Sequence, residues 1–130
     1  YLNYILLNLH LMYLILMVLN DPDRLEDLLI AWEESGVQGA TVLFSTGLGR
    51  IRQMEAWRDD MPLIPSLRDF YEVPENMNRT IFTIAKDVAL VDAVVAATKK
   101  VVGDLDESKT GLLLVLPVVR AYGVNKRKEK

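Results

Sequence analysis

The chain contains no cysteine and a single histidine, His10, among its 130 residues. Without cysteine there are no disulfides, no thiol catalysis and no thiolate metal sites. A lone histidine offers neither the spacing of a metal site nor a serine–histidine–aspartate set, and no Gly-x-x-x-x-Gly-Lys sequence is present to bind a nucleotide phosphate. We therefore do not expect an enzyme or a bound metal.

Basic residues do not outnumber acidic residues in this chain. The chain has 15 lysines and arginines against 18 aspartates and glutamates, a net charge of −3. Nucleic acid is not an expected partner, because phosphate backbones require a basic face. The hydrophobic fraction of 51% is high for a small monomer, which must cover its core with polar surface. We expect part of the apolar surface to be buried against another subunit.

Charged residues are absent from residues 1–19, and a run of that length is typical of a transmembrane helix. Two asparagines and the histidine interrupt the run, no basic residue precedes it, and no small-residue cleavage site follows. These features favour an N-terminal extension over residues 1–11 and a first strand from Met12, without direct membrane insertion. A structured segment and a membrane or targeting sequence remain the alternatives.

A helix is predicted after the first strand, with Asp21 as its N-cap and Pro22 at the first helical position. Gly36 is expected to end it. Its apolar residues recur at i, i+3, i+4 and i+7, which indicates one face packed on a sheet. These residues are Leu25, Leu28, Leu29 and Trp32.

The next stretch joins a buried strand to a glycine-rich turn. Residues 40–44 are an apolar, β-rich run, and Gly47 and Gly49 then free the backbone where Arg50 brings positive charge. Free backbone N–H groups beside a guanidinium can hold an anion. The alternative is an architectural turn with a solvated arginine.

The long segment of about residues 45–78 is expected to be functional or locally folded, because structureless stretches of this length are uncommon inside compact domains. Apolar residues between Pro62 and Pro74 have near-helical spacing, which predicts a short helix or turn. A strand at 80–85 and a helix from Asp87 to a stop at Gly103 follow.

A polar connection then precedes a last strand that ends near Pro117, and residues 126–130 form a charged tail. The order strand, helix, strand, strand, helix, strand predicts an α+β, ferredoxin-like βαββαβ fold, with an antiparallel sheet and both helices on one face. The other face would be bare, so oligomerisation is expected.

The sequences GVQGATV and TGLGR, within residues 36–50, and GLLLVLPV, residues 111–118, are two motifs that resemble the PII signalling proteins, the nitrogen regulatory P-II family. The sequence GVQGATV followed by TGLGR looks like that family's passage from first helix through second strand to long loop. The sequence GLLLVLPV from Gly111 to Val118 resembles its last core strand. The resemblance covers about residues 12–122 and suggests a PII-like domain over 12–125.

The resemblance implies a cytoplasmic homotrimer in signal transduction and nitrogen regulation, which binds a small effector in the clefts between subunits. Its long loop would act on a protein target such as a transporter or an enzyme. Apart from the resemblance, the basic residues Lys109, Arg120 and Arg50 could form an anion site, and the alternative is that each is solvated surface. The ligand-binding residues implied are Gly39, Thr41, Gly47, Leu48, Gly49, Arg50, Lys109 and Gly111.

The sequence departs from the family in places that matter for the ligand. Leu112 stands where the family has a lysine, and Gly123 and Asn125 stand where it has arginines. ATP binding of the family type is therefore not predicted, and the effector could be a nucleotide or another small anion. Two other folds share the element order: an ACT-type amino-acid-binding domain, which leaves residues 45–78 unexplained, and a CutA-like trimer, whose metal chemistry the scarce histidines disfavour.

Overall fold

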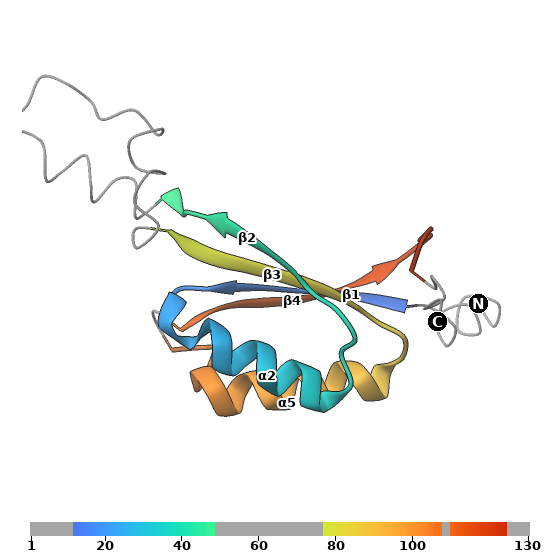
Figure 1. Ribbon diagram of the computed structural model, residues 1–130, viewed down its shortest axis with the longest axis horizontal. Helices are drawn as coiled ribbons and strands as arrows, with labels where there is room; N and C mark the ends of the chain where they lie inside the picture. The colour runs from blue at the N-terminus through green and yellow to red at the C-terminus, as the bar shows by residue number, and fades with distance from the viewer. Residues whose placement is uncertain (1–11, 49–76, 108–109, 125–130) are drawn as a thin grey trace, which may run out of the picture.

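The computed structural model describes residues 12–48, 77–107 and 110–124. In these residues one antiparallel sheet, with strand order β2-β3-β1-β4, carries two α-helices on one face (Figure 1). The elements are β1 (Met12–Leu19), η1 (Pro22–Arg24), α2 (Leu25–Ser35), β2 (Thr41–Ser45), β3 (Asn78–Ala85), α5 (Val88–Val102) and β4 (Gly111–Val118). This confirms the predicted element order and the ferredoxin-like fold. The predictions for residues 1–11, for 49–76 with its apolar stretch, and for 126–130 lie outside the described residues.

The first helical segment begins where the sequence predicts, but its first turn differs. Asp21 accepts a hydrogen bond from the Asp23 backbone N–H at 3.0 Å, and Pro22 follows as the first helical residue. Residues Pro22–Arg24 then form a 3₁₀ turn before the α-helix begins at Leu25. The Arg24 guanidinium donates to the Val101 carbonyl at 2.9 Å, which ties this turn to the end of α5.

The end of α2 is a Schellman cap. Gly36 has φ 117°, its N–H donates to the Glu33 carbonyl, and the Val37 N–H donates to the Trp32 carbonyl. Val37 is buried, as the residue after such a cap often is. Gly36 thus ends the helix as predicted, and the chain turns sharply from the helix layer toward β2.

Helix α5 also has the predicted ends. Asp87 accepts a hydrogen bond from the Leu90 N–H at 2.8 Å, and Gly103 follows the last turn with φ 90°. Lys99 and Lys100 lie in that last turn, where a positive charge favours the helix dipole. Within the described residues, no helix is both long and apolar enough to cross a membrane.

The core lies between the helices and one face of the sheet. Ile15, Met17 and Leu19 of β1 are fully buried there, and their neighbours in the core include Trp32 of α2. The Trp32 indole N–H donates to the Thr98 hydroxyl at 2.8 Å, and that hydroxyl donates to the Val94 carbonyl at 2.7 Å. These two consecutive hydrogen bonds join α2 to α5 inside the core and give the buried Trp32 N–H an acceptor.

The opposite face of the sheet is covered by no described element. The even-numbered residues of β1, β3 and β4 alternate onto it, together with the odd-numbered residues of β2. We call this the open face, and it carries no charged side chain. Its members are Met12, Leu14, Leu16, Val18, Thr41, Leu43, Ser45, Asn78, Thr80, Phe82, Ile84, Leu112, Leu114, Leu116 and Val118.

The buried hydrogen-bond chain predicts a measurable cost. Thr98→Val keeps the side-chain shape but removes the acceptor, so the Trp32 N–H stays buried and unpaired, at a cost of about 1–3 kcal/mol in the free energy of unfolding. Urea denaturation followed by tryptophan fluorescence measures this. Thr110→Val is the matched control, because its hydroxyl bonds the Glu107 carbonyl in an exposed turn. Equal stability of both variants would contradict the assignment.

Candidate functional site

The predicted ligand-binding residues separate into two groups at the two ends of β2. Gly39 and Thr41 lie at the start of this strand, whereas Gly47 and Leu48 follow its end. The strand Thr41–Ser45 alone spans about 13 Å at the rise of an extended chain. Of the other predicted residues, Gly49, Arg50 and Lys109 lie outside the described part of the chain.

Gly111 lies at the same end of the sheet as Gly47, but on the opposite edge. In the strand register Gly111 pairs with Leu19, Leu19 with Arg79, and Arg79 with Phe44. Three strand spacings, about 14 Å, therefore separate the two edges. A single copy of the chain does not bring the described members of the predicted set into one site.

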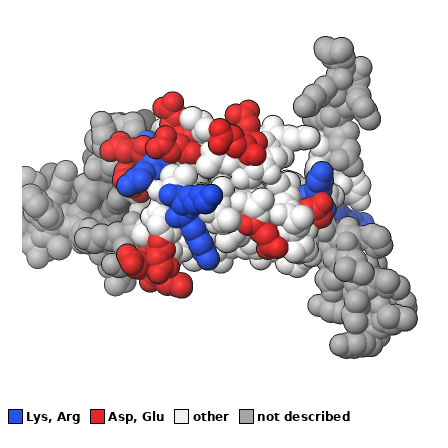
Figure 2. Space-filling model, turned by 90° about the horizontal axis from the view of Figure 1, so that it is seen from below, with Lys and Arg blue, Asp and Glu red and all other residues white. Residues whose placement is uncertain are grey.

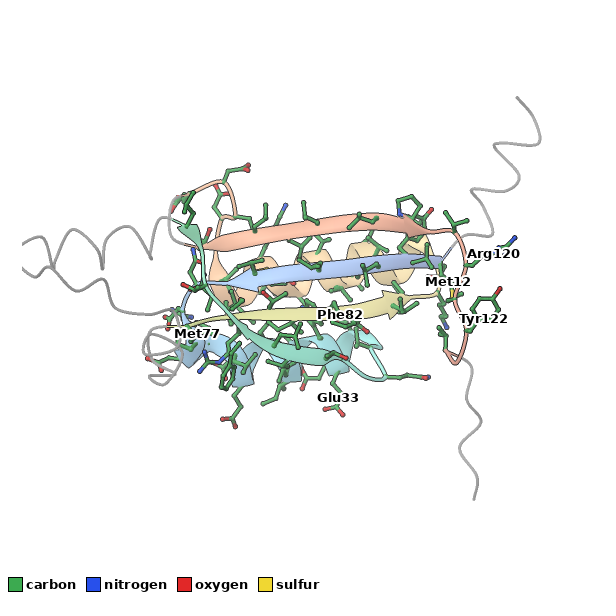
Figure 3. The ribbon with its side chains drawn as sticks, turned by 90° about the horizontal axis from the view of Figure 1, so that it is seen from above. Met12, Glu33, Met77, Phe82, Arg120 and Tyr122 are labelled. Carbon is green, nitrogen blue, oxygen red and sulfur yellow. The ribbon has the colours of Figure 1, made fainter. Side chains whose placement is uncertain are left out.

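Arg120 also lies apart from Gly111. It follows β4, whose last residue Val118 pairs with Met12, so it belongs to the end of the sheet remote from Gly111. Figure 3 shows Arg120 and Met12 at one end of the sheet and Met77 at the other. One copy of the chain therefore does not bring Arg120 to the start of β4, the strand end that Lys109 precedes in the sequence.

A cleft of about 670 Å³ opens beside Gly39 and Thr41. We call it the β2–β3 cleft. Its volume falls in the range of small-molecule sites. The Thr83 hydroxyl donates to the Gly39 carbonyl, which holds the connection between α2 and β2 against β3. The lining comprises Gly36, residues 38–41, residues 82–84, Lys86, Met12, Leu90 and Val124.

Two residues of this cleft have no signal in the sequence. Phe82 pairs directly with Thr41 across the ladder, so its ring lies on the open face beside the start of β2. Lys86 follows the end of β3 and is the ionisable side chain among the described lining residues. Neither belongs to a motif, and only the register between β2 and β3 places them next to Gly39.

The other end of β2 contains buried polar atoms that have no partner among the described residues. Within that part of the chain the Thr46 hydroxyl oxygen and the Asn78 amide oxygen accept or donate no hydrogen bond, whereas the Ser45 and Thr80 hydroxyls bond each other at 2.7 Å. A buried polar atom without a partner costs free energy. Thr46 directly precedes Gly47, so this end of the sheet has a spare hydroxyl beside the predicted anion-binding turn.

The predicted ligand-binding glycines differ in whether the fold requires glycine at their positions. Gly111 has φ 138°, and a Cβ there would clash with the Val18 carbonyl oxygen and lie 2.8 Å from the Met17 methyl carbon. Packing against β1 thus accounts for Gly111. Gly39 and Gly47 have no positive φ, and a Cβ at either position would meet no atom within 4 Å, so the fold does not require glycine at either place.

The surface charge is mixed. The helix layer, seen from below in Figure 2, shows basic and acidic side chains interspersed rather than one continuous basic field. Among the described residues, no three histidine, cysteine, aspartate or glutamate side chains are grouped to hold a metal ion. The β2–β3 cleft is a place where the described residues line a space for a small molecule.

Alanine substitutions at the three glycines should separate architecture from binding. Gly111→Ala forces a strained φ and a clash with β1, so we expect a loss of at least about 2 kcal/mol in the free energy of unfolding. Gly39→Ala and Gly47→Ala should stay within about 1 kcal/mol of the parent chain, because a compatible backbone accepts alanine. Chemical denaturation of the three variants tests this, and a large loss at Gly39 or Gly47 would refute it.

No family model matches the chain, and no curated protein matches it in sequence. Solved structures do match in three dimensions. The PII protein of Arabidopsis thaliana bound to citrate has a TM-score of 0.55 and 18% identity, over 83% of this chain and 78% of that chain. The B. subtilis GlnK–ATP complex has a TM-score of 0.55 and 18% identity, over 84% and 83%. A further B. subtilis GlnK structure has a TM-score of 0.52 and 14% identity, over 91% and 94%. The chain therefore has the fold of the PII and GlnK proteins, as its sequence motifs predict.

Proposed function

We propose that the protein is a PII-like regulatory module that binds a small anionic effector in clefts between copies of itself. The observation that carries this proposal is the β2–β3 cleft, which contains two of the residues predicted to bind ligand, Gly39 and Thr41. The segment of about residues 45–78, which leaves the sheet between β2 and β3, would act on a protein partner such as a transporter or an enzyme.

The proposal places the site between copies for a geometric reason. The two groups of predicted residues lie at opposite ends of β2, and Gly47 and Gly111 lie on opposite edges of the sheet. A neighbouring copy can supply the group that one copy lacks at each position. A homotrimer, which the PII resemblance implies, joins such edges in a closed ring.

The open face supports association independently. Leu112, Leu114 and Leu116 of β4 are each more than two-fifths exposed, and no charged side chain interrupts the face. Contiguous apolar surface of this kind marks an interaction site. Burial of this face against other copies would remove it from water.

The anionic character of the effector has support from two solved relatives in fold. One of them holds citrate and another holds ATP, and both ligands carry several negative charges. In this chain Leu112 replaces the family's lysine, so the proposal names an anion and not ATP itself. Arg50 would contribute the charge-assisted contact at the glycine turn.

The assembly is tested by its mass. Multi-angle light scattering at micromolar concentration should return three times the chain mass of 14.7 kDa. Leu114→Glu on the open face should shift the mass toward one chain, because a buried unpaired charge costs about 3 kcal/mol or more. Ile30→Glu on α2 is the matched control, since Ile30 is 46% exposed and Leu114 is 43% exposed. A monomeric parent chain would remove the assembly from the proposal.

The effector is tested by a thermal-shift screen with nucleotides, cyclic dinucleotides, citrate, 2-oxoglutarate, bicarbonate and amino acids. A ligand of the native state raises the melting temperature. Arg50→Ala should weaken binding of the effector about tenfold to a hundredfold, since a hydrogen bond to a charged group contributes about 1.5–3 kcal/mol, and should leave stability within about 0.5 kcal/mol. Unchanged affinity would exclude Arg50 from the site.

A further inference from the structure

The β2–β3 cleft has an asymmetric lining. Lys86 is its ionisable side chain among the described residues, is exposed, and makes no ion pair with them. The adjacent carboxylate of Asp87 is engaged, because it accepts the Leu90 N–H at 2.8 Å as the cap of α5. Within the described part of the chain the ammonium group of Lys86 thus has no ion-pair partner, and it can contact a group that enters the cleft.

The rest of the lining is largely uncharged and partly apolar. Phe82 and Ile84 project from the open face of β3, and Met12 begins the neighbouring strand. Phe82 is flanked by Leu16 on β1 and by Thr41 on β2, so a half-buried aromatic ring lies at the junction of three strands. Such a surface favours contact with a carbon skeleton over contact with a hydrated ion.

We infer that the β2–β3 cleft takes a small organic anion, whose acid group contacts Lys86 and whose carbon skeleton lies on Phe82 and Ile84. This inference rests on the proposed function, because it names the ligand class of that site and identifies Lys86 as a residue that determines specificity. Lys86 would thus provide the positive charge for the ligand at the start of β2, whereas Arg50 follows the other end of that strand in the sequence.

The decisive experiment compares matched ligands by calorimetry on the full chain. AMP is compared with adenosine, which lacks the phosphate, and citrate with triethyl citrate, whose three carboxylates are neutral ethyl esters. Inorganic phosphate provides the acid group alone. At least one organic anion should bind about tenfold tighter than its uncharged partner and than phosphate. Lys86→Gln should remove most of that difference and leave the affinity for the uncharged partner within about twofold.

Lys100→Gln is the control, because it removes the same charge from an exposed site at the far end of α5, about 20 Å away along a helix of 15 residues. It should bind every probe as the parent chain does.

Organic anions that bind Lys86→Gln and the parent chain equally would overturn the role of Lys86 while the proposed function stands. Phosphate alone binding as tightly as AMP or citrate would overturn the role of the apolar surface. If neither AMP nor citrate binds at millimolar concentration, this inference falls, and the wider effector screen then decides the proposed function separately.

Discussion

Two helices can cover only one face of a four-stranded sheet, and the remaining structure depends on this constraint. Ile15, Met17 and Leu19 of β1 are sealed beneath α2 and α5, and the residues between them are equally apolar. Strands that are apolar on both faces are typical of sheets buried on both sides. The described residues supply cover for one side, and the open face is the surface that the proposed neighbouring copies would bury.

The same constraint limits where the described residues leave room for a small molecule. The helix layer is filled by side chains, and the polar groups of Trp32 and Thr98 bond each other there, so they are not left for a small molecule. Polar and apolar groups are accessible to a small molecule where the connection between α2 and β2 meets the sheet. The turn after Gly36 crosses to β2 and is held by the Thr83 hydroxyl, which leaves the cleft beside Phe82 and Lys86.

Local chemistry explains why much of the fold can be predicted. Asp21, Asp87, Gly36 and Gly103 act within a few residues of their own positions, through caps and positive φ angles. The 3₁₀ first turn at Pro22 is not predicted, and neither is the contact of Arg24 with the end of α5, which joins positions 77 residues apart. The motifs predict Gly111 as a ligand glycine, and its close approach to the Val18 carbonyl gives it a packing reason that no motif reveals.

The elements, their order, their caps and the apolar character of both faces follow from the sequence alone, because each depends on neighbours along the chain. Which residues meet across the molecule follows only from the folded arrangement. The contact of Thr83 with Gly39 joins positions 44 residues apart, and the register of Thr41 with Phe82 depends on such long-range pairing. That register puts Lys86 by the cleft. The strand order β2-β3-β1-β4 leaves Gly111 on the opposite edge from Gly47, and this order is set by packing between distant segments.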